Sequence, residues 1–106
     1  MQKHKISDFF RGWIVGDFEP TMIKNSDIEV AVQNYVSGTI EPQHVHKIAR
    51  EITVIVSGKA RMGGEIYIKG DIIDISPGQS TSFEALEDTT TVVIKTPSLP
   101  NDKYLV

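Results

Sequence analysis

The sequence predicts an all-β fold, either a sandwich or a small barrel built from short strands. Apolar and polar residues alternate with a period of two through most of the chain, and glycine-containing turns recur at intervals of about ten residues. The chain has 106 residues, of which 40% are hydrophobic. A chain of this size can bury about two thirds of its unfolded surface, so we expect one core and a single domain over residues 1–106.

The predicted strands follow one another with turn-forming residues between them. Residues 27–36 form the first strand, because one face of this segment is aliphatic: Ile28, Val30, Val32 and Val36. The other predicted strands, which are rich in β-branched residues, cover residues 51–57, 60–62, 65–69, 72–75, 80–83 and 90–95. Gly63 and Gly64 join two of these strands as a hairpin, since glycine readily adopts the positive φ angles of such turns.

Two segments do not fit the strand pattern. Near the N-terminus, Ser7 or Asp8 can cap a short helix that Gly12 ends. Near the C-terminus, Pro97 and Pro100 predict an irregular tail that lies against the barrel.

The composition limits the function. Eleven basic and fourteen acidic residues give a net charge of -3, which argues against a nucleic-acid partner, because that requires a basic surface. The chain has no cysteine, so any metal must be held by His, Asp or Glu. No apolar stretch is long enough for a signal peptide or a membrane span, so we expect a cytoplasmic protein without a membrane partner.

His44, His46 and Glu51 are the residues that carry chemistry. Residues two apart on a strand point to the same face, so His44 and His46 can converge inside a barrel. Glu51 has the wrong parity for that strand, unless residues 47–50 form a turn and Glu51 begins the next, antiparallel strand. The three side chains would then come from two adjacent strands that face one interior. Two imidazoles and one carboxylate suit a divalent transition metal, namely Fe, Mn, Ni or Zn.

This stretch resembles the first motif of the cupin superfamily, in which a glycine, a His-x-His pair, a glutamate and a second glycine follow at fixed spacing. The matching residues are Gly38, His44, His46, Glu51 and Gly58. The resemblance implies a cupin-type jelly-roll barrel, also called a double-stranded β-helix, with motif 1 at 38–58 and motif 2 at 70–83. Because one fold hosts many activities, the motifs specify the fold better than the reaction.

The second motif departs from the family pattern. The family usually has a third metal-binding histidine where this sequence has Thr81, and an asparagine where it has Ala85. A two-histidine, one-carboxylate set remains, which is sufficient in some non-haem iron enzymes.

Three functions are compatible with these residues. In the first, His44, His46 and Glu51 hold a divalent metal in the barrel, and the protein binds or converts a small polar metabolite. In the second, His44 and His46 are catalytic acid and base groups of a metal-free isomerase or epimerase of sugar nucleotides, which Thr81 favours. The third is a non-catalytic module that binds a carbohydrate or another small molecule. The sequence favours the metal site and leaves open whether the protein is an enzyme.

The parity of residues 51–57 also predicts a homodimer. If Glu51 faces inward, then Thr53, Ile55 and Ser57 share its side, and an aliphatic row faces outward: Ile52, Val54 and Val56. Such a row must be covered by another sheet, by the N-terminal segment or by a second subunit. Cupin-like proteins often pair through such a surface, so the resemblance implies a two-fold homodimer.

Overall fold

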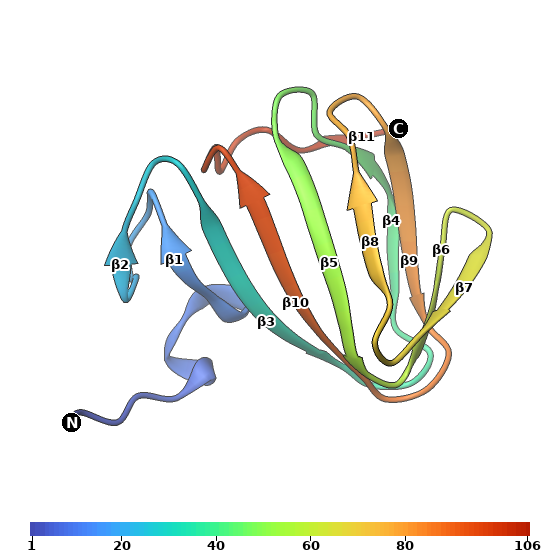
Figure 1. The fold of residues 1–106 in the computed structure, drawn as a ribbon, viewed down its shortest axis with the longest axis horizontal. Coiled ribbons are helices and arrows are strands. Elements are labelled where there is room, and N and C mark those ends of the chain that lie inside the picture. Colours follow the sequence, from blue (N-terminus) through green and yellow to red (C-terminus); the bar gives the residue numbers. More distant parts are fainter.

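The computed structural model describes residues 1–106 as two β-sheets that pack face to face (Figure 1). A cavity lies between the two sheets. One sheet has six strands in the order β2-β1-β3-β10-β5-β8, and the other has five in the order β11-β4-β9-β6-β7. In chain order the strands are β1 (Trp13–Gly16), β2 (Ile23–Lys24), β3 (Glu29–Tyr35), β4 (Ile40–Val45), β5 (Arg50–Ser57), β6 (Lys59–Met62), β7 (Glu65–Ile68), β8 (Ile72–Ile75), β9 (Ser80–Ala85), β10 (Thr89–Thr96) and β11 (Tyr104–Leu105).

The chain crosses repeatedly between the two sheets. β3, β5, β8 and β10 lie in the six-stranded sheet, while β4, β6, β7 and β9 lie in the other. This alternation of antiparallel strands between two sheets is the jelly-roll arrangement. The predicted all-β, single-domain fold is therefore confirmed.

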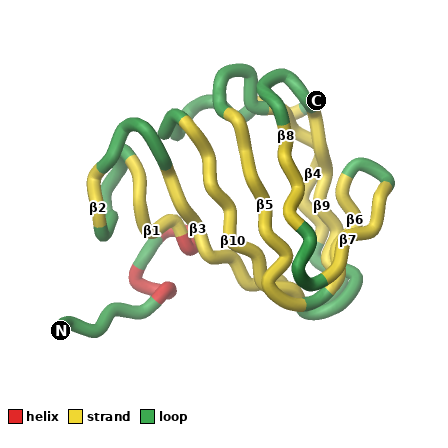
Figure 2. Tube along the Cα trace, viewed as in Figure 1, coloured by secondary structure: helices red, strands yellow, loops and turns green.

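Every strand expected from the sequence is present, and β1, β2 and β11 are additional. β1 has four residues, and β2 and β11 have two each; β1 pairs with β3, β2 pairs with β1, and β11 pairs with β4. The expected single helix is replaced by two 3-10 helices, Ile6–Asp8 and Phe10–Gly12 (Figure 2). Arg11, with a φ of 50°, breaks the helical path there. No helix is long and apolar enough to cross a bilayer.

The six-stranded sheet turns its polar side toward the cavity. Its inward-facing strand residues include several buried polar groups: Glu29, Glu51, Thr53, Thr91 and Lys95. Its outward side carries half-buried aliphatic residues: Val30, Val32, Ile52, Val54, Val92 and Ile94. A sheet with one covered face normally shows the opposite polarity, so this pattern indicates both a polar interior and an apolar outer surface.

The predicted parity of β5 is confirmed for Glu51, Thr53 and Ile55, which are buried. Ser57 is exposed, so the expectation that it faces inward was wrong. In the ladder with β10, Thr91 pairs with Ile55 but Thr90 pairs with Ser57, so one residue of β5 is skipped. This bulge breaks the alternation at the end of the strand.

An apolar core fills the part of the barrel next to β6. Its buried members come from four strands: Ile55, Ala60, Met62, Ile75, Phe83 and Ala85. The polar inner faces of β3, β4 and β10 are left to surround the cavity. The core therefore supports one side of the barrel and leaves the other side for a site.

Candidate functional site

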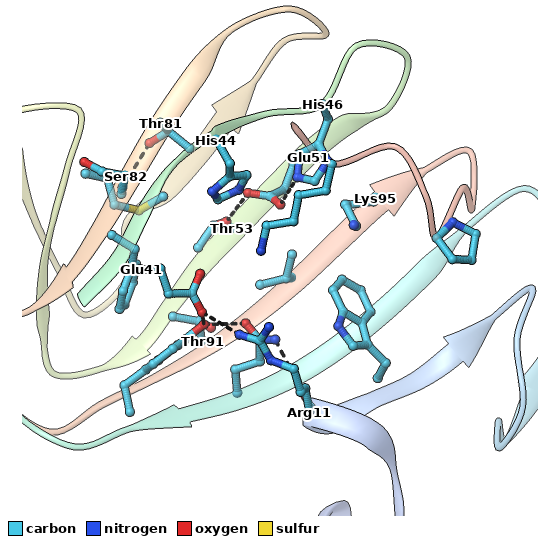
Figure 3. A pocket seen from close by; sticks show the side chains of 18 of the residues that line it. Arg11, Glu41, His44, His46, Glu51, Thr53, Thr81, Ser82, Thr91 and Lys95 are labelled. Carbon is cyan, nitrogen blue, oxygen red and sulfur yellow. Dashed lines mark hydrogen bonds and ion pairs between the residues drawn. The ribbon is translucent and has the colours of Figure 1, made fainter. Parts of the chain in front are cut away.

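The connection between β4 and β5 brings the three predicted site residues together (Figure 3). His44 lies in β4, His46 follows the end of that strand, and Glu51 lies in β5. One donor atom from each lies within 4.8 Å of the other two, and all three residues are buried. β4 and β5 belong to different sheets, so the expectation of two adjacent strands was wrong. The jelly roll sends consecutive strands to alternate sheets, and the carboxylate therefore approaches the imidazoles from the facing sheet.

Backbone carbonyl groups hold both imidazoles at Nδ1. The Nδ1 atom of His44 donates to the carbonyl oxygen of Pro42 at 3.2 Å, and that of His46 donates to the carbonyl oxygen of Asp102 at 2.5 Å. A carbonyl oxygen can only accept a hydrogen bond, so each Nδ1 carries a proton. The Nε2 atoms are the remaining donor atoms for a metal.

Acceptor oxygens face His46 on both sides of its ring. The Asp102 carbonyl oxygen lies at Nδ1, and Oε1 of Glu51 lies 3.4 Å from Nε2. Because neutral imidazole has only one N–H, its Nε2 lone pair faces the carboxylate, and a cation between the two atoms would remove that repulsion. That cation is either a second proton, which makes an imidazolium ion, or a metal ion.

The protonation states of Glu51 and His44 also suit a metal. Burial opposes a charge on Glu51, but its hydrogen bond with His46 and the nearby positive charges hold its pKa below the usual value. The Thr53 hydroxyl donates to Oε2 of Glu51 at 3.3 Å. Burial lowers the pKa of His44, which favours the neutral ring. Divalent metals bind ionised carboxylates and neutral imidazoles, so the donor set fits.

The donors open onto a cavity of about 210 Å³ between the two sheets. Pockets for drug-sized ligands measure roughly 300–1,000 Å³, so this one suits a smaller molecule. Its polar lining includes Tyr35, Glu41, Thr53, Thr81, Thr91 and Lys95. Three protein donors leave coordination positions open, and a small ligand in the cavity could fill them.

Lys95 is a cavity residue that the sequence reasoning missed. It is only 8% exposed, and its Nζ lies 3.0 Å from Oε1 of Glu29 and 4.8 Å from the centroid of the Trp13 ring. It pairs with Glu51 in the β10–β5 ladder, so it places a positive charge beside the carboxylate. Alternation along β10 could have identified it, because Lys95 shares a face with Thr91.

A second polar cluster lines the cavity and was also missed. Nη2 of Arg11 lies 2.9 Å from Oε1 of Glu41, and the Tyr35 hydroxyl lies 3.0 Å from the same oxygen and 2.6 Å from Oε1 of Gln33. Burial and the Glu41 charge raise the pKa of the Tyr35 phenol. Arg11 comes from the N-terminal segment before β1, so no strand pattern could have placed it here.

Comparison with known proteins identifies the fold at low sequence identity. No known family profile and no curated protein sequence matches the chain. Among solved structures, an uncharacterised protein with a double-stranded β-helix domain from Klebsiella pneumoniae matches with a TM-score of 0.76 and 20% identity, over 99% of this chain and 91% of its own.

Two enzymes are also similar in structure. The DMSP lyase DddQ from Ruegeria pomeroyi matches over 89% of this chain with a TM-score of 0.74 and 19% identity. Oxalate decarboxylase from Bacillus subtilis matches over 77% of this chain with a TM-score of 0.65 and 20% identity. This chain spans 49% of the lyase and 24% of the decarboxylase. The structural matches show that this protein has the double-stranded β-helix fold, as the motif resemblance to the cupin superfamily implied.

Proposed function

We propose that this protein holds a divalent transition metal ion through His44, His46 and Glu51, and that it binds or converts a small polar metabolite at that ion. The observation that carries the proposal is the position of His46 between two acceptors, the Asp102 carbonyl oxygen and Oε1 of Glu51. A metal ion between Nε2 and the carboxylate satisfies both without a buried imidazolium ion. Manganese(II) centres are described for the structurally similar Bacillus subtilis oxalate decarboxylase, which supports the choice of metal class.

The residues around the cavity would orient a small ligand. A bound divalent ion would supply Lewis-acid polarisation of a ligand oxygen. Lys95 places a positive charge beside Glu51, and the hydroxyl groups of Tyr35 and Thr91 lie in the cavity lining. Thr91 Oγ1 is buried and has no hydrogen-bond partner within the protein. This lining supports a ligand with several oxygen atoms rather than a hydrocarbon.

Elemental analysis of untagged protein tests the proposal most directly. We expect Fe, Mn, Ni or Zn at about one ion per chain, and a lower melting temperature after a chelator removes it. His44→Ala and His46→Ala should lose the ion. His4→Ala is the matched control, because His4 is exposed in the N-terminal segment. A metal-free wild type that cannot be loaded with any of the four ions would overturn the proposal.

A metal-free enzyme is the second candidate, favoured by Thr81 in place of the third histidine. His46 would then be an imidazolium ion paired with Glu51, and His44 and His46 would act as acid and base groups on a sugar nucleotide. Thermal stabilisation of metal-free protein by a panel of sugar nucleotides supports this candidate. Absence of any stabilisation leaves a non-catalytic binding module as the metal-free alternative.

We also propose that the outer face of the six-stranded sheet pairs with a second copy of the chain. The ladders align an apolar row across four strands: Ile72, Val54, Val92 and Val32. At the edge of this face, Ile72 is 66% exposed and Val56 is 44% exposed. Contiguous apolar surface of this kind marks an interaction site, and a second copy offers a surface of the same shape and polarity.

Light scattering over a series of protein concentrations tests the dimer. We expect twice the chain mass for the wild type and a monomer for Val54→Lys, which places a charge in the middle of the row. Ile66→Lys is the control, because Ile66 is exposed on β7 in the other sheet. A wild type that is monomeric at micromolar concentration would contradict the proposal. The cytoplasmic location stays a prediction, which cell fractionation can check.

A further inference from the structure

The C-terminal segment folds back against the strand that carries the candidate metal ligands. β11 lies beside β4 (Figure 1). In this pair Tyr104 lies opposite Val45 and Leu105 lies opposite His44. Nζ of Lys47 lies 4.1 Å from the centroid of the Tyr104 ring. These contacts hold the preceding residues, including Asp102, over the turn between β4 and β5.

The Asp102 carboxylate binds the backbone of that turn. Oδ1 accepts a hydrogen bond from the Lys47 amide at 3.0 Å, and Oδ2 accepts from the amides of Ile48 and Ala49 at 3.0 and 2.9 Å. The residue is only 5% exposed. Burial opposes its charge, but these three N–H groups hold the pKa of the Asp102 carboxyl below its usual value, which favours the ionised form. One side chain thus satisfies three consecutive backbone donors.

The main chain of the same residue binds His46. The Asp102 carbonyl oxygen accepts the Nδ1 proton of His46, which directs Nε2 toward Glu51. The turn that the carboxylate binds is also the segment that connects His46 to Glu51. Asp102 therefore contacts both the ring of His46, whose orientation it sets, and the turn that sets the spacing between His46 and Glu51.

We propose that Asp102 is a positioning residue of the metal centre, although it contacts neither the metal nor its ligand. This inference rests on the proposed metal-binding function. Replacing the carboxylate releases the turn, which moves the carbonyl oxygen relative to His46 and widens the range of His46 orientations. Loss of such supporting contacts typically weakens metal binding by about 10- to 100-fold.

Two variants and one control test this role. Asp102→Ala removes all three acceptor contacts, and Asp102→Asn keeps one oxygen acceptor and is expected to fold if the alanine variant does not. Asp74→Asn is the control, because Asp74 is an exposed carboxylate whose Oδ2 lies 2.7 Å from Arg50 Nη2, outside the cavity. Ni²⁺ affinity is measured by competition with a chromophoric chelator, and melting temperature reports folding.

We expect Ni²⁺ binding about 10- to 100-fold weaker in the folded Asp102 variants and unchanged in Asp74→Asn. Wild-type affinity in a folded Asp102 variant would overturn the inference. The second readout is the His46 tautomer in metal-free protein, taken from long-range ¹H–¹⁵N correlation spectra at a pH that keeps the imidazole ring neutral. We expect the Nδ1–H form in the wild type and a mixture in the Asp102 variants.

The two readouts separate the inference from the proposed function. A wild type that binds no metal overturns the proposed function, and the tautomer comparison then decides the role of Asp102 alone. In that case a mixture of tautomers in the variants supports positioning of His46 by Asp102, and an unchanged Nδ1–H form overturns it.

Discussion

Thr81 lies directly opposite His44 in the β4–β9 ladder. Side chains of such a pair project from the same face with Cβ atoms about 5 Å apart, so Thr81 stands beside a candidate ligand inside the cavity. Its hydroxyl donates to the carbonyl oxygen of Ser82 at 3.1 Å. The position is thus near the proposed metal but is occupied by a residue that binds transition metals poorly.

Thr81→His should therefore tighten metal binding, because an imidazole at this position can add a fourth protein ligand to His44, His46 and Glu51. We expect a gain of about tenfold in Ni²⁺ affinity, which corresponds to about 1.4 kcal/mol. Competition with a chromophoric chelator measures this change, and the d–d absorption spectrum of bound Ni²⁺ should change with the added ligand.

Thr90→His is the matched control for this substitution. Thr90 lies on β10 outside the cavity, where its hydroxyl donates to Oδ1 of Asn34 at 2.7 Å. It should bind Ni²⁺ with wild-type affinity and an unchanged spectrum. The expectation fails if Thr81→His shows no gain over this control.

The local part of the candidate site could be predicted from the sequence. His44 and His46 are two residues apart, and strand parity alone places both on one face. The spacing from His46 to Glu51 has the wrong parity for one continuous strand, which indicated a turn before the next strand. Parity could not indicate which sheet that strand joins, because sheet membership depends on pairing with distant strands such as β10.

The rest of the site depends on contacts between distant parts of the chain. Asp102 is 56 residues from His46, and Arg11 is 30 residues from Glu41. Asp102 lies in a tail whose two prolines predicted irregular structure, and Arg11 lies in a short 3-10 helix. Neither segment has a periodic pattern, so no sequence signal placed Asp102 beside His46 or Arg11 at the cavity.

Two motif glycines allow backbone strain to be separated from packing. Gly38 and Gly58 have nearly equal φ angles, +90° and +91°. A Cβ added at Gly38 has no atom within 4 Å, whereas one added at Gly58 would collide with the Asp88 carbonyl oxygen and with Thr89. Gly38→Ala should lower the free energy of unfolding by about 1–2 kcal/mol through the backbone alone.

Gly58→Ala should cost about 1–3 kcal/mol more than Gly38→Ala, because the added Cβ overpacks the contact with Asp88. Chemical denaturation of both variants measures the difference. Equal free energies of unfolding for the two variants would show that the contact at Gly58 relaxes easily.

Ile55 belongs to the apolar core and is fully buried. Ile55→Ala should lower the free energy of unfolding by about 2–5 kcal/mol, since it removes buried methyl groups and leaves a cavity. Ile66→Ala makes the same chemical change at a residue that is 53% exposed, and should cost less than about 1 kcal/mol. Urea denaturation of the two variants should show this difference. Similar losses in the free energy of unfolding would contradict the assignment of Ile55 to the core.

Tyr35 should make the fold sensitive to alkaline pH. Burial and the charge of Glu41 raise the pKa of its phenol in the folded protein above the ordinary value near 10. The folded state therefore keeps a proton that the unfolded state loses, so this contribution to stability is complete below pH 10 and is lost as the pH rises above it. The loss should approach about 1.4 kcal/mol per pH unit in that range.

Comparison with Tyr35→Phe isolates this effect from other groups that titrate above pH 10. The free energy of unfolding of each protein is measured by chemical denaturation at pH 9 and pH 11. We expect the wild type to lose about 1 kcal/mol more than Tyr35→Phe over this interval, because the variant has no phenol at that site to ionise. Equal losses in the two proteins would mean that burial and the charge of Glu41 do not raise the pKa of Tyr35.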